Sequence, residues 1–337
     1  KMLFTVIIPA YNAEKFIARS VNSVLKQDYP YCNYEIIIVD DCSPDNLQKK
    51  LSELCAENHD ANIRVIRHTE NKKQGGARNT AIRESRGEWI FFLDADDYWI
   101  RTDVFKVFES LILKYPESSI IESATHRDVG GYNLIVEHST PQLNANLYSG
   151  ADYFSDSGAY TGYIWTAAYK RDYICNFQFR EKVFFEDGDW KLIVFINCPK
   201  IVSIDFPFYA YVANPVSTIR GRNIEVFRAN IEVNRIILNV FLGLSKGKLR
   251  DAGLNRVKRN VKSWFKVSKE YSFRGSYKAL NHASSTELFN LSNYTLTGME
   301  KIALLSLKHC TLLTLLSIRA GIYTRRFYRK IYGKRLN

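Results

Sequence analysis

The sequence predicts an α/β fold in which a mostly parallel sheet is flanked by helices, followed by a basic helical region. Continuous apolar runs alternate with segments of helical spacing through the first hundred residues, as expected for buried parallel strands covered on both faces. Acidic or other polar residues follow several of these runs directly. Beyond residue 222 the spacing becomes helical and basic residues dominate. We therefore predict an α/β domain over residues 1–222 and a basic α-helical domain over 223–337.

The elements of the first domain follow in order. Apolar runs predict strands over 4–8, 35–39, 63–66 and 89–93, and helical spacing predicts helices over 14–26, 44–57 and 77–85. Further along we expect a helix over 104–114, strands over 119–121, 132–137 and 206–212, a loop over 150–162 and a helix over 189–196. This alternation is typical of a sheet assembled from βα units.

The C-terminal region has helical periodicity with basic residues between its apolar positions. Val233, Ile237, Phe241 and Leu244 recur at three-to-four spacing, as expected for one face of a helix. An apolar stretch over 302–318 is interrupted by Lys308 and His309, so its uninterrupted part is too short to span a bilayer.

Composition and charge narrow the class of protein. The chain of 337 residues is 46% hydrophobic and 14% aromatic, which predicts a globular protein with a sizeable core. Its six cysteines form neither a CxxC pair nor a zinc-type cluster. Scattered thiols and the lack of an opening signal peptide predict a cytoplasmic protein. Residues 1–223 have a net charge of −4 and residues 224–337 a net charge of +16, which together give the overall +12.

Three carboxylates, those of Asp94, Asp96 and Asp97, follow the strand predicted over 89–93. Ligands bind at the carboxyl ends of strands in open α/β sheets. Oxygen ligands suit Mg²⁺ or Mn²⁺, which often join one or two carboxylates to substrate phosphates. The alternative is a helix N-cap, but one Asp would suffice for a cap and three nearby like charges repel each other.

Three other loops supply polar or aromatic groups to the same rim. Tyr11 follows Pro9 after the first strand and could stack on a base, while Asp40 after the second strand could accept a base or ribose donor. Gly75 and Gly76 precede Arg78 at the start of the third helix. Backbone N–H groups at such a start, and a guanidinium, bind phosphate. Each residue alone also suits an ordinary surface or turn role.

A second acidic cluster lies much further along the chain. Glu186 and Asp187 follow apolar residues and precede the helix predicted over 189–196, with Trp190 close behind. A carboxylate beside a metal-bound diphosphate can take the proton of an attacking hydroxyl. The alternative is an acidic helix start that complements the helix dipole.

Together these motifs resemble the family 2 inverting glycosyltransferases with the GT-A fold (a Rossmann-like sheet), of the bacterial surface-polysaccharide type. The resemblance covers roughly residues 3–222. It rests on six segments in the family's order, namely 6–12, 38–45, 75–79, 92–97, 165–171 and 185–187.

The resemblance implies a role for each matching residue. Pro9, Tyr11 and Asp40 would cradle the base, usually uracil; Arg78 and Asp94 would line the nucleotide-sugar; Asp96, with Asp94, would hold Mn²⁺ or Mg²⁺; Asp187 would be the general base with Glu186 beside it; and Trp190 and Trp165 would lie near the acceptor. Cys42 stands where the family usually has Gly, which predicts a differently shaped turn.

The implied activity is metal-dependent, inverting transfer from a nucleoside diphosphate sugar, most often a UDP-sugar, to a hydroxyl of a glycan or lipid-linked glycan. A haloacid-dehalogenase-type phosphatase is one alternative, but Tyr98 stands where that family needs a small hydroxyl or aliphatic residue. A non-catalytic nucleotide- or nucleic-acid-binding protein is another. The two acidic clusters would repel a polyanion, so we expect no nucleic acid partner.

The end of the chain is basic and aromatic. Residues 319–337 contain seven Lys or Arg residues and no acid, a composition that suits an anionic membrane surface. We expect peripheral attachment to the inner face of the cell membrane as one option, and a solvated basic bundle or a homo-oligomer contact as the alternatives.

Overall fold

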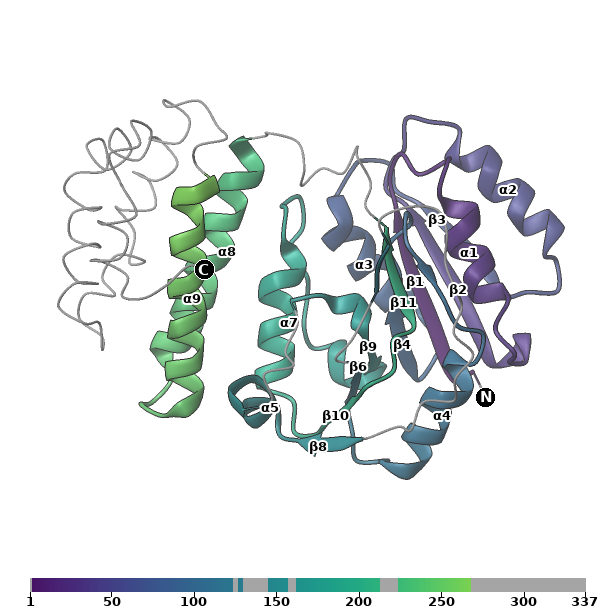
Figure 1. The fold of residues 1–337 in the computed structure, drawn as a ribbon. Coiled ribbons are helices and arrows are strands. Elements are labelled where there is room, and N and C mark those ends of the chain that lie inside the picture. Colours follow the sequence, from purple (N-terminus) through teal and green to yellow (C-terminus); the bar gives the residue numbers. More distant parts are fainter. Residues whose placement is uncertain (1, 124–126, 130–144, 157–161, 213–223, 268–337) are drawn as a thin grey trace. The chain divides into compact units, whose positions relative to one another are not determined.

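The computed structural model describes residues 2–123, 127–129, 145–156, 162–212 and 224–267 (Figure 1). The chain divides into two compact units, Lys1–Pro215 and Val216–Asn337. Each unit is described by itself. The strand predicted over 132–137, the apolar stretch 302–318 and the basic end 319–337 lie outside the described residues.

The first unit is built on an eight-stranded sheet with the order β3-β2-β1-β4-β9-β6-β10-β8. Its strands are β1 (Phe4–Ala10), β2 (Tyr34–Asp40), β3 (Ile63–Arg67), β4 (Trp89–Phe92), β6 (Ile120–Ser123), β8 (Asn146–Tyr148), β9 (Ala167–Lys170) and β10 (Ile201–Ile204). Within it β9 is antiparallel to both β4 and β6, and β8 is antiparallel to β10, while the other pairs are parallel. The prediction of a mostly parallel α/β sheet is confirmed.

Helices cover both faces of this sheet (Figure 1). The helices α1 (Ile17–Leu25), α2 (Leu47–Glu57) and α4 (Val104–Lys114) pack on one face, and α3 (Lys73–Glu84), α5 (Gly150–Asp156), α6 (Arg171–Ile174) and α7 (Glu186–Ile196) pack on the other. Alternate residues of β1 supply both layers, because successive side chains of a strand point to opposite faces. Val6 and Ile8 enter the first core, and Ile7 enters the second.

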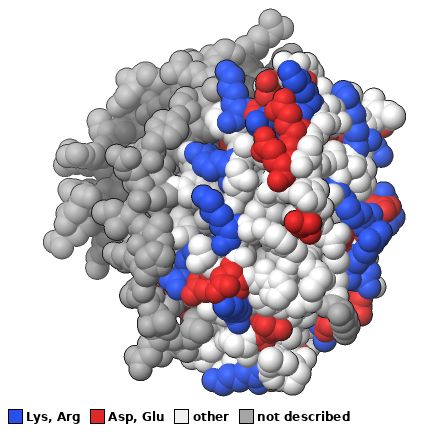
Figure 2. All heavy atoms as spheres, turned by 90° about the vertical axis from the view of Figure 1, so that its right-hand side faces the viewer, with Lys and Arg blue, Asp and Glu red and all other residues white. Residues whose placement is uncertain are grey.

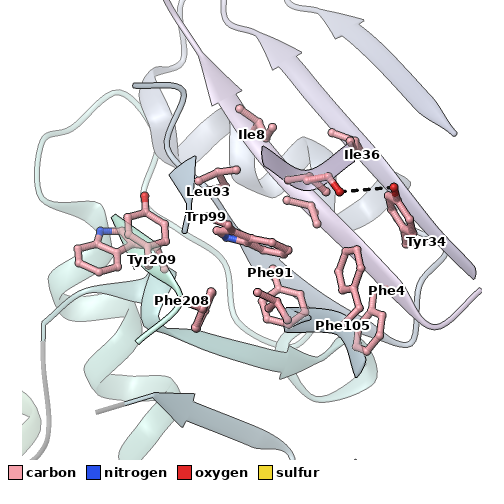
Figure 3. Close-up of a cluster of buried hydrophobic side chains, with 14 of the residues drawn as sticks. Phe4, Ile8, Tyr34, Ile36, Phe91, Leu93, Trp99, Phe105, Phe208 and Tyr209 are labelled. Atoms are coloured by element: carbon pink, nitrogen blue, oxygen red, sulfur yellow. Dashed lines mark hydrogen bonds between the residues drawn. The ribbon is translucent and has the colours of Figure 1, made fainter. Parts of the chain in front are cut away.

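Aromatic rings dominate the core beneath α4. Phe91 of β4 contacts the rings of Phe4, Trp99, Phe105 and Phe208 at centroid distances between 5.2 and 6.1 Å (Figure 3). Tilted and edge-on arrangements at such distances are favoured over face-to-face stacking. Because Trp99 comes five residues after Asp94, this packing fixes the position of the acidic loop that lies between them.

A small second sheet lies beside the acidic loop. It has the order β5-β11-β7, with β5 (Tyr98–Trp99), β11 (Tyr209–Val212) and β7 (Arg127–Val129). Since β5 begins directly after Asp97 and pairs with β11, the acidic loop is joined to a segment more than a hundred residues further along the chain.

Several predicted bounds need correction, among them the helix predicted over 189–196, which begins at Glu186, and the strand predicted over 206–212, which begins at Tyr209. Residues 150–156, predicted as loop, form α5, and Ser149 is its cap: its hydroxyl accepts the backbone N–H of Asp152 at 3.2 Å. The third helix begins at Lys73 and not at Ala77. Pro9 lies inside β1, where Ile7 is the last residue paired with β4, so its missing N–H removes no hydrogen bond from the ladder.

The described part of the second unit contains two helices, α8 (Ile224–Gly243) and α9 (Lys248–Val267), which pack side by side. A β-carbon at Gly253 would lie 2.2 Å from the Phe241 ring, so glycine at this position lets the two helices approach closely. No helix among the described residues is both long and apolar enough to cross a bilayer.

The surface charge of the first unit is mixed. Figure 2 shows Lys and Arg interspersed with Asp and Glu on the face viewed from the side of α1 and α2. Among the described residues that this view shows, basic side chains form no extended patch.

Candidate active site

The predicted site loops meet at the carboxyl ends of the parallel strands. The loops after β1 and β2 are tied together, because Asp41 N–H donates to the Ala10 carbonyl at 2.9 Å and Asn12 N–H donates to the Ser43 hydroxyl at 3.1 Å. Asp45 accepts the N–H of Glu14 at 3.0 Å. The turn residues around Tyr11 therefore have fixed positions relative to the acidic pair Asp40–Asp41.

Backbone strain is concentrated at this rim. Among the described residues, the non-glycine positions with positive φ are Asn12, Cys42, Lys73, Lys182 and Phe185, at 52° to 62°. They follow β1 and β2, open α3, and lie just before Glu186. Such conformations cost free energy and tend to cluster at functional sites, which supports this rim as the site.

The backbone conformation at Cys42 is one that glycine adopts more easily than cysteine. Its φ of 62° lies in the left-handed region, which costs a side-chain-bearing residue about 1–2 kcal/mol. Cys42→Gly should therefore raise the free energy of unfolding by about 0.5–1 kcal/mol after the entropy of glycine in the unfolded chain is subtracted. Urea denaturation measures this change. Cys42→Ala is the matched control, because it removes the thiol but keeps the β-carbon; a gain from alanine equal to that from glycine would contradict the strain explanation.

The side chain of Asp40 has no exposed surface and serves the turn. Its Oδ1 accepts the N–H of Ser43 at 2.9 Å, and its Oδ2 accepts the side-chain amide of Gln48 at 2.5 Å and lies 3.5 Å from Arg67 Nε. The predicted base contact does not fit this position, because both carboxylate oxygens of Asp40 already have partners within the protein. Asp40 is better described as the residue that shapes the loop.

The adjacent Asp41 has an unused acceptor. Its Oδ1 lies 2.7 Å from His68 Nδ1 and accepts the N–H of Lys72 at 2.9 Å. Its Oδ2 is buried and has no hydrogen-bond partner among the described residues. A buried carboxylate oxygen without a donor is costly, and a donor from a ligand would relieve this cost. Tyr11, whose ring is 54% exposed, lies on the neighbouring loop, whereas Pro9 is buried in β1.

Arg78 joins the two acidic clusters. Its buried guanidinium donates to Asp94 Oδ1 at 2.9 Å and to Glu186 Oε1 at 2.5 Å, and it lies over the Phe179 ring at 5.6 Å. The neighbouring carboxylates, chiefly Asp94 and Glu186, raise the pKa of Arg78 despite its burial. The two clusters, which lie ninety residues apart in the sequence, are thus parts of one site.

The glycines before Arg78 allow this junction. A β-carbon at Gly75 would lie 2.1 Å from the Arg180 carbonyl oxygen, so the first turn of α3 packs directly on the segment that leads to Glu186. The N–H of Lys182 also donates to the Lys72 carbonyl at 2.9 Å. Glycine was predicted here for a turn; its role in the structure is close packing inside the helix.

The acidic loop 94–97 is held by α1. The Ser20 hydroxyl lies within 3.2 Å of the carbonyl oxygens of Asp94, Ala95 and Asp97, and Arg19 donates to that of Asp96. These contacts fix all four backbone carbonyls of the loop and therefore the directions in which its side chains leave the backbone.

The three aspartates of this loop differ in their surroundings. Asp97 is buried; it accepts the Tyr209 hydroxyl at 2.7 Å and the N–H of Val212 at 2.8 Å, and burial raises its pKa to about 8. Asp96 is half-buried, and the Asp94 side chain is 21% exposed. Asp97 therefore anchors β11, and Asp94 and Asp96 are the candidates for binding.

The carboxylates of Asp94 and Asp96 would suit a divalent cation whose shell is completed by oxygen atoms of a ligand. No group of three or more His, Cys, Asp and Glu converges around a metal position within the described residues. Mg²⁺ commonly needs only one or two protein carboxylates when phosphate oxygens complete its shell. Burial raises the pKa of Asp94 above its usual range, and the charges of Asp96 and Asp187 raise it further. Such an accumulation of negative charge is what a divalent cation would neutralise.

Asp187 has the electrostatic character of a general base. Burial and the neighbouring Glu186 raise the pKa of Asp187 to about 6. Burial also raises the pKa of Glu186, which remains bound to Arg78. A base with a pKa near the working pH combines a useful ionised fraction with proton affinity. Of the pair, Asp187 is the residue available for chemistry, since Glu186 is 3% exposed.

The predicted acceptor contacts of the two tryptophans do not fit their positions. Trp190 is 3% exposed, stacks on Phe179 at 4.1 Å, and donates its indole N–H to the Phe177 carbonyl. Trp165, in the 3₁₀ turn η2 (Ile164–Thr166), is 4% exposed and stacks between Tyr163 and Tyr209. Tyr163, which the sequence interpretation missed, provides the exposed ring of this stack, at 45%.

Other site residues escaped prediction from the sequence. They are Asp41, His68, Lys191 and Tyr209. For Asp41 a signal existed, because it follows the same strand as Asp40. For Tyr209 and Lys191 the local sequence holds no such signal, since their partners in the structure are distant in the sequence.

Comparisons with known proteins agree with this architecture. The family model described as glycosyl transferase family 2 matches residues 5–175. The fold is that of a GT-A protein: the solved structure of S. aureus TarS 1-349 in complex with UDP-GlcNAc is similar, with a TM-score of 0.73 at 19% identity, covering 100% of this chain and 94% of that chain. Because the family model spans half of the sequence, the chain belongs to glycosyl transferase family 2.

The relatives found by sequence include two bacterial proteins, TuaG and WfgD. The chain is 38% identical over 141 residues to the putative teichuronic acid biosynthesis glycosyltransferase TuaG of Bacillus subtilis, covering 42% of this chain and 51% of TuaG. It is 43% identical over 98 residues to the Escherichia coli protein WfgD, named as a UDP-Glc:α-D-GlcNAc-diphosphoundecaprenol β-1,3-glucosyltransferase, covering 29% of this chain and 36% of WfgD. The matched segments thus span about half or less of these relatives.

Proposed function

We propose that this protein transfers a sugar from a UDP-sugar to a hydroxyl of a glycan or lipid-linked glycan in the synthesis of a bacterial surface polysaccharide. The observation that carries the proposal is the Arg78 junction, which brings Asp94 of the acidic loop and the Glu186–Asp187 pair into one site. The names of TuaG and WfgD support the acceptor class, and the UDP-GlcNAc complex of TarS supports the donor class.

The proposed reaction is a single displacement with inversion at the anomeric carbon. The acceptor oxygen attacks C1 of the sugar while its proton passes to a carboxylate oxygen of Asp187. The bond from C1 to the diphosphate oxygen breaks, and its electron pair leaves with UDP. Arg78 holds Asp94 and Glu186 in place, and inversion requires the acceptor oxygen to approach C1 on the side opposite the diphosphate.

Asp96, with Asp94, would hold Mg²⁺ or Mn²⁺ on the donor diphosphate. When bound, the cation would neutralise charge that develops on the departing diphosphate. The oxygen ligands of the two side chains suit either ion.

A donor panel tests the proposal directly. Purified full-length protein is incubated with UDP-, GDP- and dTDP-sugars and with Mn²⁺, Mg²⁺ or EDTA, and release of the nucleoside diphosphate is measured with and without glycan acceptors. We expect metal-dependent release from one or more UDP-sugars that rises with acceptor. Lack of both nucleotide binding and release across the whole panel would refute the proposal.

Asp41 should read the base. Uracil N3–H is a donor that would satisfy the unpartnered Oδ2, and loss of such a bond costs about 1–3 kcal/mol. Asp41→Asn should lower UDP affinity about tenfold to a hundredfold, because the side-chain amide of the variant would place its own N–H donor against the N3–H donor of uracil. Cytosine N3 is an acceptor, so CDP binding should weaken less or improve. Calorimetric titration of UDP and CDP measures both values.

The neighbouring Asp40 supplies the comparison for that experiment. Asp40→Asn disturbs a buried turn contact and should lower the thermal midpoint while the UDP-to-CDP preference stays unchanged. A shift in base preference from Asp40→Asn but not from Asp41→Asn would reassign the base contact to Asp40, as the sequence first predicted.

A further inference from the structure

A buried ion pair lies one helical turn beyond Asp187. The side chains of Lys191 and Glu122 have no exposed surface, and Lys191 Nζ lies 2.5 Å from Glu122 Oε1. The same ammonium donates to the Tyr163 carbonyl at 2.5 Å and to the Thr166 hydroxyl at 3.1 Å. A lysine carries three N–H donors, and the acceptors named here come from β6 and from the segment 163–166 that contains η2.

Stability does not explain such a pair. Two charges taken out of water lose much of their attraction to desolvation, and apolar residues of similar volume are often equally or more stabilising. Fixing one particular arrangement is a better-supported role for buried polar groups. The question is therefore which arrangement the Lys191–Glu122 pair fixes.

The pair ties the start of α7 to η2. On one side of the helix start, Glu186 is bound to Arg78 at 2.5 Å. On the next turn, Lys191 is bound to both ends of the segment from Tyr163 to Thr166. Asp187 lies between these two attachments, four residues before Lys191. The position of Asp187 is thus set by the contact of Glu186 with Arg78 on one side and by the contacts of Lys191 with residues 163–166 on the other.

The η2 segment carries an aromatic stack toward the acidic loop. Tyr163 stacks on Trp165 at 4.6 Å, and Trp165 stacks on Tyr209 at 4.1 Å. The Tyr209 hydroxyl lies 3.2 Å from the N–H of Asp94 and donates to Asp97. The buried Lys191 ammonium therefore joins the segment that carries the exposed Tyr163 ring to the helix that carries Asp187.

We propose that Lys191 and Glu122 are positioning residues that hold Asp187 and the Tyr163–Trp165 stack in a fixed relation, so that an acceptor hydroxyl lying against this side of the site meets the base. This inference rests on the proposed transfer reaction. Neither residue touches the reacting atoms; both act through the helix turn and η2.

The double variant Glu122→Gln with Lys191→Met tests the role, because it removes both charges while keeping side-chain size. We expect a thermal midpoint within a few degrees of the wild type, a kcat at least tenfold lower with the acceptor, and an unchanged Kd for UDP. Lys191→Met alone leaves Glu122 buried without its ion-pair partner and should lower the midpoint by roughly 10 °C. A stable double variant with wild-type kcat would overturn the proposal.

Hydrogen exchange provides a readout independent of turnover. In the ligand-free double variant, amides of residues 163–166 and 186–190 should exchange faster, while those of the loop 40–45 should not. Unchanged exchange in both segments would overturn the proposal even if kcat fell. If the wild type transfers no sugar from any donor, the proposed function fails, and hydrogen exchange still decides the positioning role.

Glu35 supplies the matched control. It is also fully buried, accepts the Thr5 hydroxyl at 2.9 Å and pairs with Arg64 at 3.2 Å, but it lies at the opposite end of β2 from Asp40, roughly 17 Å away at strand rise. Glu35→Gln should lower the thermal midpoint and leave kcat unchanged. A comparable fall in kcat from Glu35→Gln would show that any buried carboxylate has this effect, and would overturn a specific role for Lys191.

Discussion

Asp187→Asn should remove sugar transfer while leaving the folded protein intact. The amide cannot take the acceptor proton, and loss of a positioned base typically costs about 10²–10⁴-fold in rate, or roughly 3–5 kcal/mol. The Kd for UDP should remain within a factor of about three, because the base acts on the acceptor side. Single-turnover transfer and calorimetric UDP binding measure the two effects. Turnover near that of the wild type would refute the assignment of the base.

The pH dependence gives a second signature of Asp187. Its pKa is raised to about 6, and the proposed reaction needs the carboxylate. The wild-type kcat/KM should therefore rise about tenfold per unit below pH 6 and level off above it, whereas the residual rate of Asp187→Asn should lack this limb. An exposed acid elsewhere, Asp172 at the start of α6 (side chain 81% exposed), is the control: Asp172→Asn should keep both rate and profile.

The raised pKa of Asp187 also determines whether its ionisation stabilises or destabilises the folded protein. A carboxyl whose folded pKa lies above its unfolded value stabilises the fold at low pH, and this contribution is lost as the pH rises through the folded value. Asp187→Asn removes the cost of ionising the buried group, so above pH 6 the variant should be at least as stable as the wild type. A loss of activity at that pH can then be separated from unfolding.

Most of the sheet could be predicted because its signal is local. The segments 4–8, 35–39 and 63–66 are mostly apolar over strand length, with one polar or charged residue in each. The helix predicted over 104–114 has the bounds of α4. The α5 helix was missed although Ser149 and Asp152 have capping spacing. Its short length and the surrounding glycines and serines outweighed that local signal.

The site could be predicted only to the level of loops. Asp40 and Asp41 follow the same strand, and the choice between them depends on which carboxylate the turn itself consumes, a property of the folded loop. Trp190 lies on the buried stripe of α7 with Val194, a spacing that already favoured a core position. Lys191 could not have been predicted to be buried, because its partner Glu122 lies 69 residues away in the sequence.

Removing the charge of Arg78 should damage both stability and function. Arg78→Met keeps most of the volume of the side chain but leaves the partly buried Asp94 and the buried Glu186 without their cation. Breaking a buried ion pair in this way costs about 3–5 kcal/mol. UDP binding should weaken as well, since Asp94 loses the contact that orients it. Urea denaturation at pH 7 measures the loss of stability, and UDP titration measures the loss of affinity.

The ionic origin of this loss can be tested with pH. Arg78 lowers the pKa values of Asp94 and Glu186 against the effect of burial, so both values rise further in Arg78→Met. Protonated carboxyls need no cation, and the stability deficit of the variant should therefore shrink as the pH falls from 8 to 5. Adding Glu186→Gln to Arg78→Met should recover part of the stability at pH 7 and none of the transfer activity. A deficit that stayed constant across this range would mean that Arg78 stabilises the site by packing on Phe179 and not by its charge.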